Sequence, residues 1–187
     1  MNLKLILSGV GGQGILFSTR IFTELALEKG YNVIGSEIHG MAQRGGSVIS
    51  HVKIGDYSSP LVRKGTADIL FAFDQDEACR TLAFLKRGGL CFVNSSKEDF
   101  WAPAIKAYLE KNEIRAYSFP ADKVALALGV PRSANLALIG YALSVPDVPF
   151  SYQDLRETIV RLSPPQFIEA NLSAFDTGYR GGNEQRI

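Results

Sequence analysis

At the start of the chain, a short apolar run is followed by a segment whose apolar residues have helical spacing. The apolar run over residues 3–8 ends at a glycine cluster, after which apolar residues recur at intervals of about three and four: Phe17, Ile21, Phe22 and Leu25. This pattern predicts a strand, a tight turn and a helix. Similar apolar runs predict five further strands, over residues 31–35, 48–54, 68–73, 90–93 and 114–119.

Segments of helical composition separate most of the later strands. Residues 74–87 and 99–111 are both predicted to be helical, the first ending at Gly88-Gly89. The continuously apolar run over 68–73 is typical of a strand that is buried on both faces of a parallel sheet. The alternation predicts an α/β fold, namely a three-layer sandwich around a mixed, mostly parallel sheet of about six strands with a Rossmann-like first β-α unit.

The last third of the chain is predicted to be helical. Helices are expected near residues 121–128, 133–143, 152–162 and 166–175, with several prolines between them. Ser151 and Ser163 are candidate helix caps. The polar, glycine-rich tail 178–187 is expected to be frayed and flexible. No Pro- or Ser-rich linker divides the 187 residues, so the sequence predicts a single domain over 1–187.

Charge and hydropathy narrow the classes of partner. The 20 basic and 19 acidic residues nearly cancel, and no Lys/Arg cluster is present, so nucleic acid is not an expected partner. No apolar stretch is long enough to cross a bilayer, and the first run lacks the basic leader and long apolar core of a signal peptide. We therefore expect a soluble, cytoplasmic protein that does not bind membranes.

The cysteine content argues against a metal centre in this chain. Cys79 and Cys91 are the only two cysteines, and both are interpreted as buried, reduced core residues. An iron–sulfur cluster usually requires about four thiolates, and a zinc site requires a tighter group of Cys and His than this sequence contains. No metal ligands are therefore assigned.

The first glycine cluster has the spacing of a nucleotide-binding turn. Gly9, Gly11 and Gly14 fit the dinucleotide fingerprint, and Glu37 follows where an acid that binds ribose would lie. Glycines allow the backbone to approach a ligand, and the unpaired amides of a helix start attract an anion. The alternative is that these glycines only permit close packing of the strand against the helix.

A second glycine-rich loop, residues 36–47, concentrates reactive side chains. Arg44 could bind a carboxylate or phosphate, His39 could transfer a proton near neutral pH, and the Gln43 amide could donate to a carbonyl. Alternatively, Glu37 pairs with Arg44 and His39 caps a turn. His51, on a predicted strand, is expected to be structural.

Two strings make the sequence resemble a known family. Residues 9–14 (GVGGQG) and 36–46 (SEIHGMAQRGG) are similar to those of the gamma-type subunit of 2-oxoacid:ferredoxin oxidoreductases, in particular the beta subunit of the indolepyruvate type. The similarity extends to the helix near residues 135–140. The HGMAQRGG string is far more specific than the fingerprint.

The resemblance implies a complex that decarboxylates an aryl 2-oxoacid on thiamine diphosphate, passes electrons through iron–sulfur clusters to ferredoxin, and releases an acyl-coenzyme A. Pyruvate and branched-chain 2-oxoacids remain alternatives. Gly55-Asp56-Tyr57 lacks the third glycine of the usual thiamine-binding string. The resemblance therefore places the thiamine diphosphate and the clusters on a large partner subunit, with no cofactor tightly held by this chain and coenzyme A as a co-substrate. The chain is expected to be inactive without that subunit, and it could self-associate.

The candidate site residues follow from both arguments. The expected catalytic residues are His39, Gln43 and Arg44, and the expected cofactor-binding residues are Gly9, Gly11, Gly12, Gln13, Gly14, Glu37 and Asn135. The glycine turn is left with three possible contacts: coenzyme A, thiamine diphosphate or the partner alone. Asn135 is equally well interpreted as a helix cap. The alternative functions are a self-contained dinucleotide-binding protein and a non-catalytic scaffold subunit.

Overall fold

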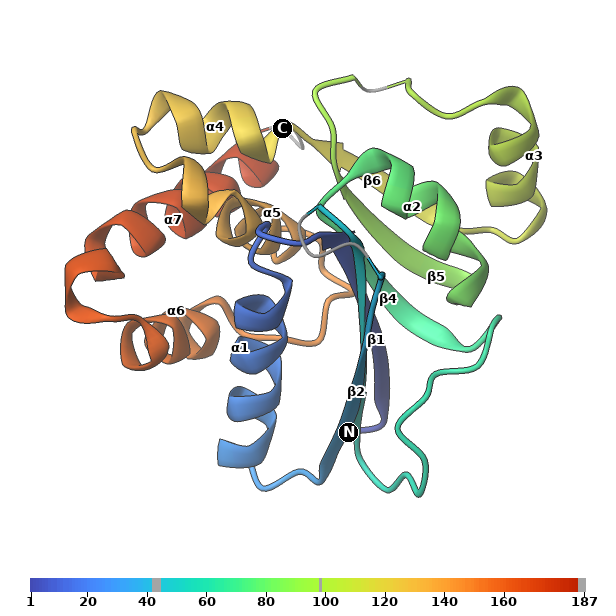
Figure 1. Ribbon diagram of the computed structural model, residues 1–187, viewed down its shortest axis with the longest axis horizontal. Helices are drawn as coiled ribbons and strands as arrows, with labels where there is room; N and C mark the ends of the chain where they lie inside the picture. Colours follow the sequence, from blue (N-terminus) through green and yellow to red (C-terminus); the bar gives the residue numbers. More distant parts are fainter. Residues whose placement is uncertain (42–44, 98, 185–187) are drawn as a thin grey trace.

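The computed structural model describes residues 1–41, 45–97 and 99–184. Its strands form one twisted sheet that runs through the centre of the molecule (Figure 1). In chain order the strands are β1 (Leu3–Val10), β2 (Val33–His39), β3 (Ser47–Ile54), β4 (Ala67–Ala72), β5 (Leu85–Asn94) and β6 (Arg115–Phe119).

The strand order is β2-β3-β1-β4-β5-β6. Strands β1, β4, β5 and β6 are parallel neighbours, whereas β3 is antiparallel to both β1 and β2. The predicted mixed, mostly parallel sheet is therefore confirmed. The sequence did not predict that β3 would lie between β1 and β2, and this insertion moves the β2 residues one strand further from the first glycine turn.

Helices cover both faces of the sheet, which confirms the three layers. One face carries α1 (Ile15–Glu28), α4 (Ala121–Ala127), α5 (Ala134–Ala142), α6 (Tyr152–Leu162) and α7 (Ile168–Glu184), and the other carries α2 (Gln75–Thr81) and α3 (Pro103–Lys111) (Figure 1). One apolar core lies between the sheet and the helices on each of its two faces. Helix α5 is buried from Asn135 to Ala142, in agreement with its mostly apolar sequence. None of the described helices is long and apolar enough to cross a bilayer.

Two predicted helix boundaries are wrong. The predicted 74–87 helix begins as expected, because the Asp74 carboxylate caps it by accepting from the backbone N–H groups of Asp76 and Glu77. It ends at Thr81, however; a short 3-10 segment follows, and β5 begins at Leu85. The predicted 99–111 helix begins only at Pro103, because Phe100 and the buried Trp101 pack into the core first.

The predicted fraying of the tail from Gly178 is also wrong up to Glu184, where α7 ends. Gly178 lies against α5 so closely that a Cβ atom there would be 1.9 Å from the carbonyl oxygen of Ala137. Gly140 faces α7 in the same way. The glycines that suggested disorder are therefore needed for helix contact. Residues 185–187 lie outside the described part.

The predictions for the helix caps, the cysteines and His51 are confirmed in part. Ser151 caps α6 as predicted, its hydroxyl accepting from the Asp154 amide at 3.4 Å. Ser163 is instead at the end of α6, where its hydroxyl accepts from the side-chain amide of Asn171 at 2.8 Å. Cys91 is buried as expected, and burial raises its pKa, but Cys79 is exposed on α2. The buried position of His51 agrees with a structural role.

Candidate functional site

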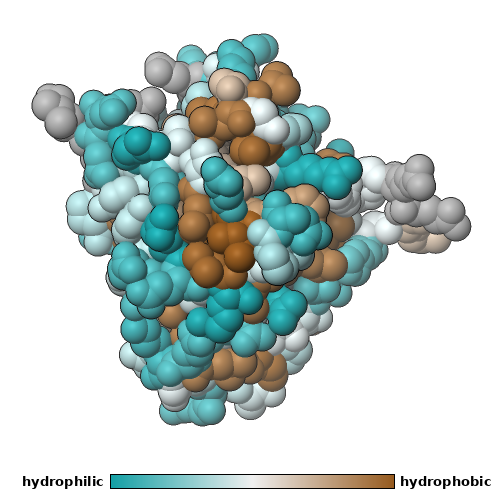
Figure 2. All heavy atoms as spheres, turned by 90° about the vertical axis from the view of Figure 1, so that its left-hand side faces the viewer, coloured by the Kyte–Doolittle hydropathy of each residue, from teal (hydrophilic) through white to brown (hydrophobic). Residues whose placement is uncertain are grey.

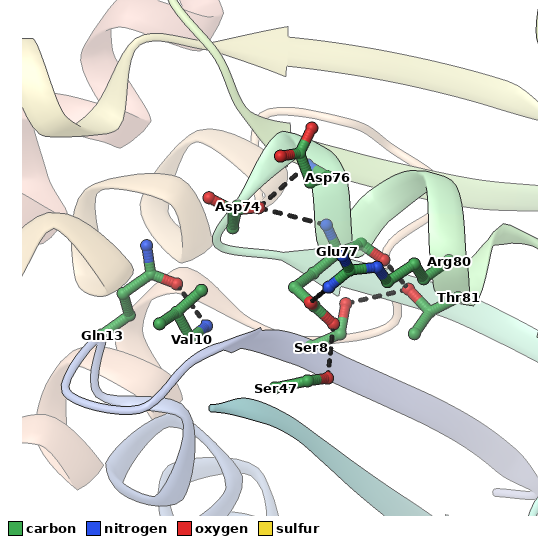
Figure 3. A network of polar contacts seen from close by, with 9 residues as sticks. All are labelled: Ser8, Val10, Gln13, Ser47, Asp74, Asp76, Glu77, Arg80 and Thr81. Atoms are coloured by element: carbon green, nitrogen blue, oxygen red, sulfur yellow. Dashed lines mark hydrogen bonds and ion pairs between the residues drawn. The ribbon is translucent and has the colours of Figure 1, made fainter. Parts of the chain in front are cut away.

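The first glycine cluster forms a closed turn between β1 and α1, and so confirms the Rossmann-like first unit. Gly12 and Gly14 have positive φ angles of 103° and 78°, which favour glycine. The side-chain carbonyl of Gln13 accepts from the backbone N–H of Val10 at 2.7 Å (Figure 3). The backbone N–H of Gln13 in turn donates to the Val10 carbonyl. Gln13 therefore shapes the turn with its oxygen, which leaves its NH2 group as the part that can donate to a ligand.

The two glycine clusters lie side by side. The Gly11 amide donates to the Gly46 carbonyl at 2.9 Å, and the Gly40 amide donates to the Ser47 carbonyl at 2.7 Å. These bonds join both stems of the second loop to each other and to the end of β1. Gln43 and Arg44, which are predicted to be catalytic, belong to the same loop but lie outside the described residues.

Glu37 and His39 do not lie in the second loop, where the sequence predicted them, because β2 continues through His39 at the edge of the sheet. The imidazole Nε2 of His39 is 3.5 Å from a carboxylate oxygen of Glu37, and about half of the His39 side chain is exposed. In the sheet register, Glu37 of β2 lies opposite Ser50 of β3, and Ser50 lies opposite Leu7 of β1. Two strand spacings of about 4.8 Å therefore separate Glu37 from β1, unlike the Rossmann arrangement in which the acid-bearing strand adjoins β1.

Asn135 reaches the first turn from the start of α5. Its side-chain NH2 donates to the Gly14 carbonyl at 3.3 Å and to the Ser18 hydroxyl at 2.9 Å, and that hydroxyl also donates to the Gly14 carbonyl. The residue is buried. Asn135 therefore supports the glycine turn, and the alternative interpretation as a cap of its own helix is wrong.

A cavity of about 530 Å³ opens beside the turn. It is lined mainly by apolar groups, with Arg132 and Asn135 as its notable polar members: Gly14, Phe17, Gly129, Val130, Pro131, Arg132, Ser133, Asn135, Pro164, Phe167, Ala170 and Asn171. Its lining comes from the starts of α1, α5 and α7, from the segment between α4 and α5, and from the segment between α6 and α7, on the side of the molecule shown in Figure 2. An apolar patch lies near the centre of that face, surrounded by hydrophilic residues.

Three residues that line the cavity are not among the candidate site residues that the sequence predicts: Arg132, Phe17 and Phe167. Arg132 is exposed and forms no ion pair with any other described residue. The available signal was an arginine just before the mostly apolar 134–142 segment, because such a helix is expected to be buried while a charged side chain at its start must reach solvent. The positions of Phe17 and Phe167 depend on tertiary packing, for which the sequence has no local sign.

The described residues do not fit the cofactors that the resemblance implies for the complex. The two cysteines cannot supply the thiolates of a cluster, and no group of three or more potential metal ligands occurs in the described ranges. Gly55-Asp56 follows β3, at the end of the sheet opposite the glycine turns, and Asp56 accepts from the Asn32 side chain at 2.9 Å. No reaction step is therefore assigned to such a group in this chain.

A sequence model of the family described as pyruvate ferredoxin/flavodoxin oxidoreductase matches residues 4–181. The chain belongs to this family. Another family member, the indolepyruvate oxidoreductase subunit IorB of Pyrococcus horikoshii, is 35% identical over 199 residues, with 97% of this chain and 96% of that protein covered. The resemblance inferred from the two glycine strings is thus confirmed.

Two further comparisons concern the length and the fold of the chain. The ketoisovalerate oxidoreductase subunit VorA of Methanothermobacter marburgensis is 26% identical, and the match covers 95% of this chain but only 36% of that longer one. The gamma subunit of a keto/oxoacid ferredoxin oxidoreductase from Geobacter sulfurreducens superposes with a TM-score of 0.76 at 26% identity, covering 96% of this chain and 98% of that subunit. The fold is therefore that of a gamma subunit.

Proposed function

We propose that this chain is the small subunit of a 2-oxoacid:ferredoxin oxidoreductase that acts on indolepyruvate or another aryl pyruvate. The reaction is oxidative decarboxylation, in which the 2-oxoacid loses its carboxylate as carbon dioxide, the acyl group joins the sulfur of coenzyme A, a proton is released, and a pair of electrons passes to ferredoxin. The observation that carries the proposal is the joining of both glycine clusters beside an apolar cavity, in a chain that aligns over nearly its whole length with an indolepyruvate oxidoreductase subunit.

The thiamine diphosphate and the clusters are assigned to a larger subunit. The poor fit of the described residues to either group supports this division, as does the presence of a related segment inside a longer chain. The glycine turns and the adjacent cavity would then face that subunit and complete a shared active site. This subunit is expected to be inactive when it is alone.

The turn is assigned to the anionic part of coenzyme A. The backbone N–H of Gly11 donates to Gly46 and that of Gln13 to Val10, but Gly12 and Gly14 make no amide hydrogen bond to any described residue. Their N–H groups, with the uncapped start of α1, suit a diphosphate. Asn135 donates to the Gly14 carbonyl and so fixes the Gly14–Ile15 peptide, whose N–H lies at the uncapped start of α1.

The cavity is assigned to the rest of the coenzyme A molecule. Its apolar lining, with Phe17 and Phe167, suits an extended and mostly uncharged arm, and Arg132 supplies a cation for a phosphate. At the end of β2, His39 is proposed to transfer a proton with Glu37 orienting its ring, while Arg44 and Gln43 of the second loop bind the substrate carboxylate and carbonyl.

Anaerobic co-expression with the large subunit tests the proposal. We expect the two chains to co-purify and the complex to reduce ferredoxin in the presence of an aryl pyruvate and coenzyme A, faster than with pyruvate or ketoisovalerate. The isolated chain should have no such activity. Activity of the isolated chain, or a complex inactive on every 2-oxoacid, would contradict the proposal.

Dinucleotide binding is the competing function, because the Rossmann-like unit and its glycine spacing are present. The separation of Glu37 from β1 argues against it. Titration of the isolated chain with NAD and NADP distinguishes the two: micromolar binding would favour the dinucleotide, and its absence favours the subunit.

A further inference from the structure

Helix α2 carries a buried carboxylate that the proposed chemistry does not use. Glu77 is only 1% exposed. One of its carboxylate oxygens accepts from the Ser47 hydroxyl at 2.6 Å, and the other pairs with the guanidinium of Arg80 on the next turn (Figure 3). This side chain therefore links α2 to the first residue of β3.

Stability alone is a poor explanation for this carboxylate. Removing a carboxylate from water is costly, and the Arg80 side chain that pairs with it is 66% exposed, so much of that attraction is screened. An apolar residue of similar size would fill the same space without the desolvation cost. A carboxylate at this position is better explained by what it holds.

A second polar contact lies one helical turn further along α2. Thr81 is also buried, and its hydroxyl is 2.9 Å from the Ser8 hydroxyl on β1. Residues four apart share one face of a helix, so Glu77 and Thr81 both face the sheet. The strand residues that they contact adjoin the glycine clusters, because Ser8 precedes Gly9 and Ser47 follows Gly46.

We infer that Glu77 is a positioning residue that holds the Ser47 end of the second glycine loop. Ser47 accepts from Gly40 through its carbonyl, and its neighbour Gly46 accepts from Gly11, so an anchor at Ser47 also fixes the contact between the two clusters. The consequence for catalysis rests on the proposed function. The positioning of Ser47 by Glu77 does not depend on the proposed function, and it can be measured without an assay of turnover.

The first experiment uses limited trypsin digestion of the isolated full-length chain, followed at the Arg44–Gly45 bond. We expect cleavage there to be about tenfold faster in Ser47→Ala and Glu77→Ala, and to return towards the wild-type rate in Glu77→Gln, which keeps an acceptor for the Ser47 hydroxyl. Cleavage after the exposed Arg63 in the same samples reports general loosening. Glu113→Gln, at an exposed ion pair with Arg87, is the matched control and should change neither rate.

The second experiment measures turnover in the assembled complex. Ser47→Ala and Glu77→Ala should each lower kcat about tenfold while the KM for the 2-oxoacid changes less than twofold, and the double variant should be no slower than either single one. Ser47 is partly exposed, so its variant should fold even if Glu77→Ala does not.

Three results would overturn the positioning role: unchanged cleavage at Arg44, cleavage at Arg44 and Arg63 that rises equally, or single-variant effects on kcat that multiply in the double variant. A wild-type complex inactive on every 2-oxoacid would instead remove the proposed function, and the proteolysis result would stand by itself.

Discussion

Gly11 donates its backbone N–H to the carbonyl oxygen of Gly46 at 2.9 Å, and this bond joins the two glycine clusters. The Gly11 N–H is therefore not among the unpaired amides of the turn that could attract an anion. The clusters form one structural unit. A substitution that disturbs either cluster should therefore affect both.

Gly14→Ala should distort the turn more than its backbone angle alone requires. An alanine would be strained at φ 78°, and its Cβ would lie 2.7 Å from the Asn135 amide nitrogen. Gly30 has the same φ, but a Cβ atom there would meet nothing within 4 Å, so Gly30→Ala should cost only the backbone strain of about 1 kcal/mol. We expect Gly14→Ala to lower the free energy of unfolding by about 2 kcal/mol more. Chemical denaturation of both variants measures the difference, and equal losses would show that Asn135 moves aside freely.

Arg132→Ala should weaken the binding of coenzyme A. If the exposed guanidinium binds a phosphate at the mouth of the cavity, its loss should raise the KM for coenzyme A about tenfold, which corresponds to a charge-assisted hydrogen bond of about 1.4 kcal/mol. The kcat and the KM for the 2-oxoacid should be nearly unchanged. Steady-state assays of the complex test this, with Arg87→Ala, which removes an exposed ion pair elsewhere, as the control. An unchanged KM for coenzyme A would contradict the assignment of the cavity to coenzyme A binding.

Arg44→Ala separates an active-site loop from a scaffold. A loop that binds the substrate should lose at least about tenfold in turnover, because the charge-assisted contact is lost, while the two subunits still co-purify. Loss of the complex itself, seen by size-exclusion chromatography, would favour the scaffold alternative. Arg63→Ala, in an exposed loop, controls for the loss of a surface charge.

The sequence was sufficient for the fold class and the family because both depend on local signals. Strand and helix alternation predicted the layers, and the string around His39 carried the family resemblance. It also singled out Asn135, whose side chain donates to the Gly14 carbonyl. These signals lie within short windows of residues.

What the sequence could not supply depends on contacts between distant segments. The antiparallel insertion of β3 moved Glu37 away from β1, although the spacing of the motif is that of a dinucleotide turn. The role of Glu77 is invisible in the sequence, because nothing in residues 74–87 indicates that its carboxylate meets Ser47. The glycines of α7 looked like disorder because the helix they face was unknown.

Gly178→Ala tests that last point directly. Alanine is favoured over glycine within a helix by about 1 kcal/mol, yet here its Cβ would lie 1.9 Å from a backbone carbonyl oxygen of α5. Since a backbone atom cannot rotate away, the two helices must separate, and we expect a loss of about 3 kcal/mol in the free energy of unfolding. Gly181→Ala in the same helix meets only the Phe119 ring at 3.3 Å and should be nearly neutral. Equal stabilities of the two variants would contradict the close contact of α5 and α7.

His51 should make the stability of the chain fall at mildly acidic pH. The imidazole is buried on β3, its Nδ1 accepts from the Val62 amide at 3.2 Å, and its Nε2 has no partner among the described residues. Burial, with a smaller effect of Lys53, lowers the pKa of His51 below its ordinary 6.5. The unfolded chain therefore binds a proton at a higher pH than the folded chain does, so the stabilising effect is fully present above pH 6.5 and is lost as the pH falls below that value.

Urea denaturation between about pH 5 and 8 measures this dependence, with His51→Asn as the comparison because asparagine retains an acceptor for the Val62 amide but does not titrate. We expect the stability difference between wild type and His51→Asn to shrink as the pH falls from about 7 towards 5. The stability of the wild-type chain should itself fall over this pH range. If the free energy of unfolding of His51→Asn falls with pH as steeply as that of the wild-type chain, another group is responsible for the acid sensitivity.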